Sequence, residues 1–466
     1  MGEELWRESA TSLARLIRSG EVSSREVVES HLARIEEVNP ALNAIVEVRP
    51  DEVRAEADAA DARTKSGGPL GPLHGVPFTI KISHDVAGYA TSEGCESLKD
   101  FVATKDAPMV ARMRGAGAVA LARTNMPDLG LRMNTESSLY GATHNPWRHG
   151  YTTGGSSGGE AAALASGMSP IGLGGDLGGS LRSPAYACGI SSIKPSRGRV
   201  PGVNPSAVID PGLDSQVMGV SGVMARRVDD VVLGLKVVMG AHRSDPQSVD
   251  VPYHGPTESR RVALVAAPLG GTTDPAVAEG VRVAGRALRR AGYVVDEVEP
   301  PMLFETYFAW AELVSTNLTV NRSMLASLIG DGGRRFLELT DVGFAPSTPE
   351  TLFVMHQSRW RVASEWRLFM SDYPLVVGPT WTQPPFEHGF DIIDQESALK
   401  VVEMVRFTLP ANLLGLPAAS VPTGTANGFP TGAQIIANLY REDLCLEAAK
   451  VVEEFVGPLT PIDPQP

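Results

Sequence analysis

The sequence predicts an α/β protein built as a single large domain, with a mixed β-sheet core covered by helices on both faces. Short β-branched runs alternate with helical patterns along most of the 466 residues, which is typical of an α/β sheet. Apolar residues make up 43% of the chain and charged residues 20%, the balance of a globular protein with a sizeable core. No linker, internal repeat or low-complexity tract divides the chain.

The first 66 residues are predicted to form a peripheral helical layer within this domain. Ser23 or Ser24 can cap the second helix, because Glu26 follows at the spacing of a capping box. The expected helices cover residues 12–19, 24–38 and 51–66.

From residue 70 onward the pattern changes to strands and helices in alternation. Small residues dominate 159–167, which predicts a helix that another element can approach closely. Strands are expected over 75–82, 118–124, 169–176, 260–268, 293–299, 416–424 and 432–438, and helices over 108–115, 159–167, 275–292 and 442–456.

Charge and cysteine content restrict the class of protein. The formal net charge of -13 disfavours nucleic acid and anionic membranes as partners, because their phosphates would repel the chain. No run of 18 apolar residues and no basic start followed by an apolar core is found, so we expect an unexported, cytoplasmic protein. Cys95, Cys188 and Cys445 are widely spaced, which predicts free thiols rather than disulfides or a zinc site.

Three common kinds of site fit the sequence poorly. Residues 155–159 match G-x-S-x-G, which would make Ser157 a nucleophile, but the preceding "WRHGYTTG" is polar where that motif needs an apolar strand. His144 and His149 lack an accompanying carboxylate cluster, and no HExxH occurs, so no metal is expected. The glycine-rich loops also lack the spacings of nucleotide-binding motifs.

Serine hydroxyls among glycines leave a different chemistry open. Ser156 and Ser180 lie in "GGSSGG" and "GDLGGSLRSPA", which are either flexible surface turns or exposed nucleophiles. A serine needs a partner that takes its proton, and a buried lysine can do so if its pKa falls from about 10.4 toward neutrality. Lys81, one of only eight lysines, ends the apolar run 76–80, although a lysine at a strand end can equally reach solvent.

The order of motifs resembles the amidase signature family over almost the whole chain. "GPLHGVPFTIK", "TNMPDLG", "YGATHNPW", "TTGGSSGGEAAALASG" and "GDLGGSLRSPA" follow one another, and "FTLPANLLGLPAASVPTG" and "GAQII" follow near the end. The resemblance implies the amidase signature fold and a Ser-Ser-Lys triad of Lys81, Ser156 and Ser180. Ser180 would be the acylated nucleophile, and Ser156, after a cis peptide bond from Gly155, would pass its proton toward Lys81.

The resemblance also assigns supporting roles. The backbone N–H groups of Leu177, Gly178 and Gly179 would form an oxyanion hole with that of Ser180, and Gly130 would line the substrate channel. Ser157 is expected to be structural, and we interpret Asp176 and Arg182 as buried scaffold. Where many members have Lys-Asp or Lys-Glu-Asn this chain has "KISHD", so His84 and Asp85 either tune Lys81 or lie at the surface, which we favour.

The implied reaction is hydrolysis of a small-molecule amide through an acyl-enzyme, without metal or cofactor. Esters and carbamates present the same carbonyl geometry and could also react. No nucleic acid or membrane partner is expected. A homodimer is compatible with the resemblance, although no sequence feature settles the oligomeric state.

Specificity is expected to come from residues 301–390, a variable insertion that holds 14 of the 28 aromatic residues. Within it, "GPTWTQPPFEHGFD" resembles a segment near the active site of family members, so Trp381, Gln383 and Phe386 are the preferred substrate contacts. Any single ring could instead pack in the core, and we expect two or three to reach the pocket. The other candidate rings are Tyr307, Trp310, Phe353 and Trp360.

Two other functions compete with this interpretation. In the same family, the glutaminase component of glutamyl-tRNA amidotransferase, its A subunit, liberates ammonia from glutamine inside a complex. The aromatic middle segment argues against that role, as does Ser183, where glutamine would be expected in that component. The intact Lys81, Ser156 and Ser180 disfavour the second competing function, that of a non-catalytic binding protein.

Overall fold

The central feature of the computed structural model is a mixed β-sheet, eleven-stranded within the described residues, 4–341 and 348–465. Strand β2 is parallel to both of its neighbours, and so is β11 near the other edge. The strands between these two groups pair in antiparallel fashion. In order across the sheet the strands are β1 (Ile45–Glu47), β3 (Val119–Thr124), β2 (Pro77–Lys81), β8 (Ile171–Asp176), β10 (Val220–Ala225), β9 (Ser191–Lys194), β14 (Ala418–Ala426), β15 (Phe429–Ala437), β13 (Leu375–Gly378), β11 (Arg261–Leu264) and β12 (Val294–Glu297).

Helices and two small hairpins complete the described fold. The hairpins are β4 (Glu136–Ser137) with β5 (Gly141–Ala142), and β6 (His144–Asn145) with β7 (Arg148–Thr152). The helices are α1 (Ala10–Ser19), α2 (Ser24–Leu42), α3 (Pro50–Lys65), α4 (Pro108–Gly115), α5 (Gly158–Ala165), α6 (Arg182–Cys188), α7 (Leu213–Met218), α8 (Val228–Val238), α9 (Pro275–Arg290), α10 (Leu303–Val320), α11 (Arg322–Leu328), α12 (Asp331–Asp341), α13 (Pro349–Asp372), α14 (Gln395–Met404), α15 (Leu409–Leu413) and α16 (Glu442–Val456).

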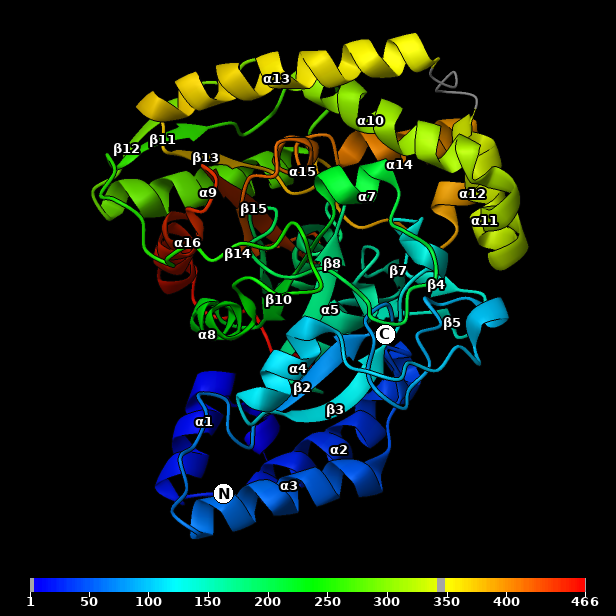
Figure 1. Ribbon diagram of the computed structural model, residues 1–466. Helices are drawn as coiled ribbons and strands as arrows, with labels where there is room; N and C mark the ends of the chain where they lie inside the picture. The colour runs from blue at the N-terminus through cyan, green and yellow to red at the C-terminus, as the bar shows by residue number, and fades with distance from the viewer. Residues whose placement is uncertain (1–3, 342–347, 466) are drawn as a thin grey trace.

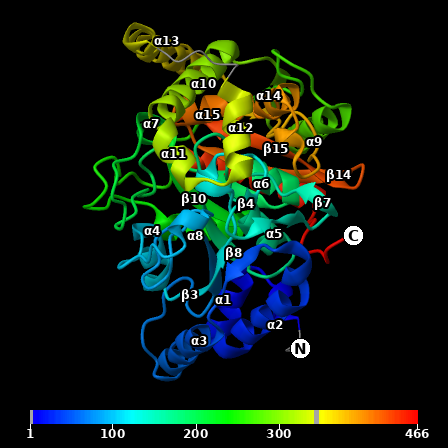
Figure 2. The same ribbon diagram turned by 90° about the vertical axis from the view of Figure 1, so that its right-hand side faces the viewer.

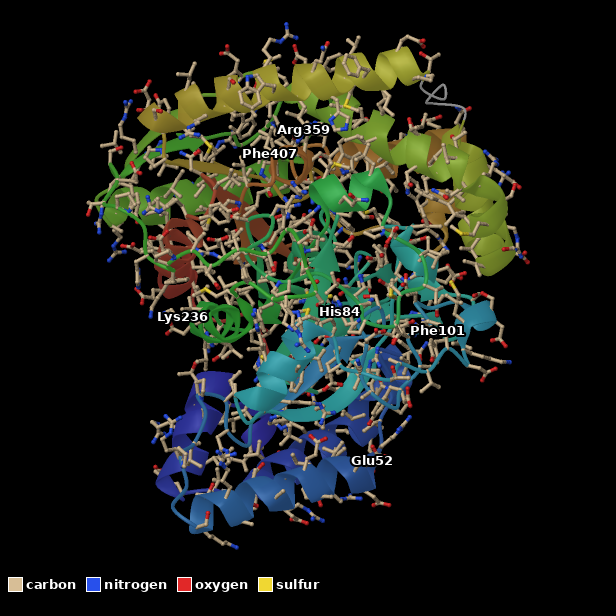
Figure 3. The ribbon with its side chains drawn as sticks, in the orientation of Figure 1. Glu52, His84, Phe101, Lys236, Arg359 and Phe407 are labelled. Carbon is tan, nitrogen blue, oxygen red and sulfur yellow. The ribbon has the colours of Figure 1, made fainter. Side chains whose placement is uncertain are left out.

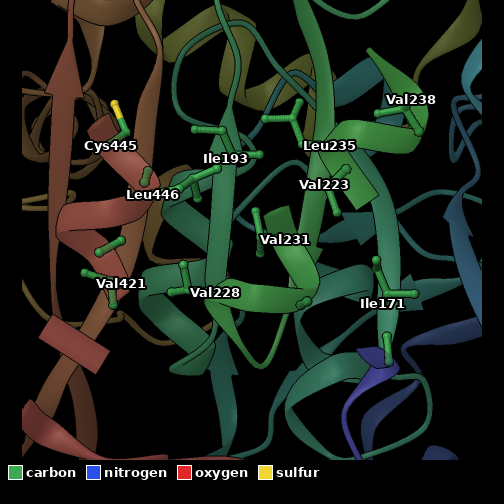
Figure 4. Close-up of a cluster of buried hydrophobic side chains, with 14 of the residues drawn as sticks. Ile171, Ile193, Val223, Val228, Val231, Leu235, Val238, Val421, Cys445 and Leu446 are labelled. Carbon is green, nitrogen blue, oxygen red and sulfur yellow. The ribbon is translucent and has the colours of Figure 1, made fainter. Parts of the chain in front are cut away.

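Both faces of the sheet are covered, as the sequence predicts. Helices α1, α4, α8, α9 and α16 pack on one face, where alternate strand residues such as Ile193 and Val223 meet Val231 and Leu235 of α8 (Figure 4). On the other face, α2, α3, α5 and α6 cover one half of the sheet, and α13 and α15 cover the other half. Because successive strand residues point to opposite faces, each central strand is buried on both sides.

Residues 4–66, which include α1 to α3, lie at one end of the molecule (Figure 1). Ser23 caps α2 in a capping box with Glu26, as predicted. The helix continues through Pro40 to Leu42, beyond its predicted end at residue 38. This layer also contributes β1, an unpredicted edge strand that pairs with β3.

The aromatic-rich segment 301–390 is mostly helical, and its Phe344 lies outside the described residues. Helix α13 crosses the end of the molecule opposite α1 to α3 (Figure 1), and α10 packs beside it. Helices α11 and α12 follow α10 down the side of the molecule (Figures 1 and 2). Strand β13 of this segment pairs with β11 and β15, and so belongs to the central sheet.

The three cysteines are buried free thiols, in agreement with the sequence interpretation. Burial raises the pKa of Cys95 to about 12, so this thiol stays protonated near neutral pH. Within the described ranges, every helix is too short or too polar to serve as a membrane span.

Candidate active site

Lys81 is the last residue of β2, between β3 and β8. Strand alternation directs Phe78 and Ile80 into the core on one face, so Thr79 and Lys81 point toward α5 on the other. Only 3% of Lys81 is exposed, and its Nζ donates a hydrogen bond to Ser156 Oγ at 2.6 Å. Burial lowers the pKa of Lys81 from 10.5 to about 7, against the opposing effect of nearby carboxylates. The alternative that Lys81 reaches solvent is therefore wrong.

Ser156 is held in a tight loop just before α5. Its peptide bond to Gly155 is cis, as the resemblance implies. A Cβ on Gly155 would lie 2.4 Å from the Arg132 carbonyl oxygen, so only glycine fits there. Gly130 has a φ of +71°, and a Cβ on it would lie 3.1 Å from Ser156 Oγ. Close backbone approach from two sides thus fixes the Ser156 hydroxyl beside Lys81.

Ser180 lies in the loop between β8 and α6. Its carbonyl oxygen accepts a hydrogen bond from the backbone N–H of Ser157 at 3.3 Å, which ties the two serine loops together. Ser180, Ser156, Lys81 and Gly130 line one cavity of about 940 Å³. The hydroxyl of Ser157 instead donates to the Gly175 carbonyl oxygen at 3.3 Å, the structural role expected for it.

Asp176 and Arg182 form the scaffold of the Ser180 loop, as predicted. Both side chains are fully buried, and Arg182 donates two hydrogen bonds of 3.0 Å to the Asp176 carboxylate. Arg182 also donates to the Thr408 carbonyl oxygen and to Gln434 Oε1, both at 2.9 Å. Although burial by itself raises it, the pKa of Asp176 is held below its usual range by the Arg182 charge.

One predicted oxyanion donor is already engaged. The N–H of Gly179 donates to Asp176 Oδ1 at 2.8 Å, because the turn after β8 closes on this carboxylate. The backbone N–H groups of Leu177, Gly178 and Ser180 have no acceptor among residues 4–341 and 348–465. These three groups, rather than the predicted set with Gly179, are the donors left for a substrate oxygen.

The three preferred substrate contacts lie outside this cavity. Trp381 is completely buried in a core cluster and stacks on Phe386, with ring centroids 5.8 Å apart. Gln383 turns toward the surface, where its Nε2 donates to the Thr272 carbonyl oxygen at 3.3 Å. None of the three lines the cavity, because the segment after β13 packs its rings beneath α6 and α14 instead.

Two aromatic residues of segment 301–390 do reach the cavity, within the expected number. Trp310 packs against the Ser180 loop, with its Nε1 donating to the Leu177 carbonyl oxygen at 3.0 Å, and Phe336 lies on α12. Phe353 and Trp360 of α13 are 65% and 79% exposed and point away from the site. The wall on the α10 to α12 side also includes Ala311, Val314, Leu318, Leu325 and Leu337.

His84 and Asp85 are buried, which corrects the expectation that they lie at the surface. Asp85 accepts hydrogen bonds of 2.7 Å from Thr91 Oγ1 and from the Ser206 N–H, so the loop around residue 206 covers it. His84 is labelled near the middle of the molecule in Figure 3. It is buried, and it is one of the residues that line the cavity. Burial, with the Lys81 charge, lowers the pKa of His84 to about 3, so its ring is neutral.

Two carboxyl groups beside Lys81 escaped the sequence analysis. Glu160 is completely buried on α5, where it accepts hydrogen bonds from the hydroxyls of Thr79 and Thr124. Burial raises the pKa of Glu160 to about 8 and also raises that of Glu93, which lines the cavity. The signal available for Glu160 was a single charged residue in an otherwise small, apolar helix.

Comparison with known proteins agrees with this geometry. A family model described as Amidase matches residues 26–446. The chain is 38% identical to an indoleacetamide hydrolase of Bradyrhizobium diazoefficiens, covering 98% of this chain and 88% of that protein. It is 32% identical to the glutamyl-tRNA(Gln) amidotransferase A subunit of Nitrosococcus oceani, covering 95% of this chain and 96% of that protein.

A solved structure supports the same assignment. That of a bacterial aryl acylamidase of the amidase signature family superposes with a TM-score of 0.84 at 27% identity, covering 98% of this chain and 96% of the other. The chain therefore belongs to the amidase family and is a hydrolase acting on amides.

Proposed function

We propose that this chain hydrolyses amides through an acyl-enzyme on Ser180. The hydroxyl oxygen of Ser180 attacks the amide carbonyl carbon, while its proton passes to Ser156 and a proton of Ser156 passes to Lys81. Collapse of the tetrahedral intermediate breaks the C–N bond, and the proton returns through Ser156 to the leaving amine. Water then attacks the ester by the same route and releases the acid.

The observation that carries this proposal is the 2.6 Å hydrogen bond between Lys81 Nζ and Ser156 Oγ in a desolvated site. A lysine with a pKa of about 7 is neutral in a large fraction of molecules near neutral pH and can act as a base. The N–H groups of Leu177, Gly178 and Ser180 would hold the oxyanion.

The cavity wall favours an amide with an apolar or aromatic acyl group. Trp310, Phe336 and the aliphatic residues of α10 to α12 offer apolar area on one side of the Ser180 loop. The similarity to an indoleacetamide hydrolase and to an aryl acylamidase supports this substrate class. Aryl carbamates and esters present the same carbonyl and are proposed as secondary substrates.

Covalent labelling tests the nucleophile. After incubation with a fluorophosphonate, intact mass should show one adduct on the parent protein and none on Ser180→Ala. Ser183→Ala is a matched control, because this nearby buried hydroxyl has no hydrogen-bond partner among the described residues and does not line the cavity. An adduct that persists in Ser180→Ala would exclude the proposed nucleophile.

A second assay separates amide hydrolysis from the glutaminase function of the related amidotransferase component. The apolar wall predicts that the protein releases aniline from an anilide with an aromatic acyl group, and that it releases little ammonia from glutamine. The reverse ranking would favour the glutaminase function.

A further inference from the structure

The catalytic cavity contains a buried carboxylate that the proposed reaction does not use. Asp214, on α7, lines the cavity and is 4% exposed. Its Oδ2 accepts a hydrogen bond from Asn317 Nδ2 at 3.1 Å, and its Oδ1 accepts from the Ser215 N–H at 2.7 Å. No residue in the described part of the chain forms an ion pair with it.

The pair of Asp214 and Asn317 is built with a fixed orientation. Asn321 Nδ2 donates to Asn317 Oδ1 at 2.9 Å, so the amide nitrogen of Asn317 faces Asp214. Gly212 leaves the space that both side chains occupy, because a Cβ there would lie 2.4 Å from Asn317 Oδ1 and 2.7 Å from Asp214 Oδ1. These contacts hold the carboxylate in the cavity wall.

The carboxylate retains acceptor capacity in this position. Each carboxylate oxygen can accept two hydrogen bonds, and each oxygen of Asp214 accepts one short hydrogen bond, from Asn317 or from the Ser215 N–H. The Ser215 hydroxyl and the N–H of Asp214 itself also lie near enough to lower its pKa, but they do not offset the effect of burial. A desolvated charge with unused lone pairs is costly unless a donor reaches it. Burial also raises the pKa of Asp214, which is a sign of incomplete compensation.

Helix α10 gives an approximate spacing between this carboxylate and the Ser180 loop. Trp310 contacts the Ser180 loop at Leu177, and Asn317 lies seven residues later on the same face of α10. Seven residues correspond to about 10 Å along the helix axis. The cavity wall between these two points is apolar, with Ala311, Val314 and Leu318.

We infer that Asp214 and Asn317 form a specificity site that binds an N–H donor at the far end of an apolar acyl group. This inference rests on the proposed function, because it assigns a substrate feature to the same cavity. A hydrogen bond spans about 3 Å. The donor nitrogen should therefore lie about 7 Å from the scissile carbonyl, the reach of an indole N–H on a three-carbon chain.

The test measures binding rather than turnover, so that it does not depend on the acyl-enzyme. Calorimetry in the Ser180→Ala background would compare 4-(indol-3-yl)butanamide with its N-methylindole counterpart, which lacks the donor. Hydrogen bonds to charged groups contribute about 1.5–3 kcal/mol, so the N–H compound should bind about 10- to 100-fold more tightly. Adding Asp214→Asn leaves only a neutral acceptor oxygen, so the preference should fall to that of a weak neutral hydrogen bond, about threefold.

Asp245→Asn is the control with the same loss of charge in the same cavity. The two oxygens of Asp245 accept hydrogen bonds from the N–H groups of Gly202 and Gln247, both at 2.9 Å. The Asp245→Asn variant should leave the preference for the N–H compound unchanged. Equal affinities for the two compounds before Asp214 is altered would overturn the inference, whether or not the variant folds. A preference of unchanged size after Asp214→Asn, or failure of both compounds to bind, would also overturn it. Failure of the proposed nucleophile would show separately, as labelling of Ser180→Ala.

Discussion

Replacing Lys81 with methionine should inactivate the protein and stabilise its fold. The ammonium of Lys81 is removed from water in the native state, which lowers its pKa from 10.5 to about 7. Each pKa unit corresponds to about 1.4 kcal/mol, so keeping this side chain protonated costs the native state about 5 kcal/mol. Methionine has a similar length and no charge to bury, and it also lacks the base.

The stability gain should depend on pH in one direction. Between about pH 7 and 10.5 the unfolded chain holds a proton on Lys81 that the native protein has released. Stability of the parent protein therefore rises with pH through this window, relative to the variant. Lys81→Met should exceed the parent by about 5 kcal/mol at pH 6, and this gain should shrink toward zero near pH 10.5.

Urea unfolding of Lys81→Met and of the parent at pH 6, 8 and 10 measures this difference in stability. The dependence of kcat/KM on pH measures the pKa of Lys81 in the active protein. In the parent, kcat/KM for an anilide should rise with pH to a plateau, with its midpoint near pH 7. With an unshifted pKa, only about 1 in 3,000 molecules would carry neutral Lys81 at pH 7.

Lys105→Met is the matched control, because Lys105 is exposed to solvent. It should change neither the rate profile nor the pH dependence of stability. A constant difference between Lys81→Met and the parent from pH 6 to 10 would refute the desolvation argument. An acid limb centred near pH 10 would refute the lowered pKa of Lys81 in the active protein.

Two further substitutions test the groups around the site. Arg182→Leu leaves the buried Asp176 carboxylate without its charge partner and should lower the free energy of unfolding by about 3–5 kcal/mol, measured by urea denaturation. Adding Asp176→Asn should recover part of that loss, and no recovery would contradict the pairing argument. Burial raises the pKa of Glu160 from 4.5 to about 8, so parent stability falls as pH rises through this window. The stability gain of Glu160→Gln should therefore grow from pH 5 to pH 8 by about 3.5 kcal/mol, and a gain that stays constant would contradict it.

The sequence predicted the parts of the site that depend on local geometry. Lys81 ends an apolar strand, and the glycines around Ser156 and Ser180 permit close backbone approaches that few other residues allow. Such constraints act over a few residues and are visible as motifs. The alternation of strands and helices likewise predicted the sheet, because the periodicity of each element is a local property.

The cavity wall could not be predicted in the same way. Whether a ring such as Trp381 or Trp310 faces the substrate depends on how helices far apart in the sequence pack against one another. The contact between Asp214 and Asn317 joins α7 to α10 and leaves no trace in either segment alone. The burial of His84 and Asp85 depends on a loop more than 100 residues away in the sequence.

The low pKa of Lys81 needs an explanation, because Asp176, Glu160 and Glu93 all lie near enough to favour an ammonium. Asp176 is ionised, but the adjacent guanidinium of Arg182 compensates its charge. The pKa values of Glu160 and Glu93 are raised by burial, so these groups are less ionised than exposed carboxylates would be near neutral pH. The attraction of each carboxyl group for the Lys81 ammonium is therefore weakened, in one case by a charge partner and in the others by burial. Desolvation is then the largest effect on the pKa of Lys81 and lowers it. Exposing Glu160 or Glu93 to water would lower its pKa and ionise it more fully, which would raise the pKa of Lys81 and weaken it as a base at neutral pH.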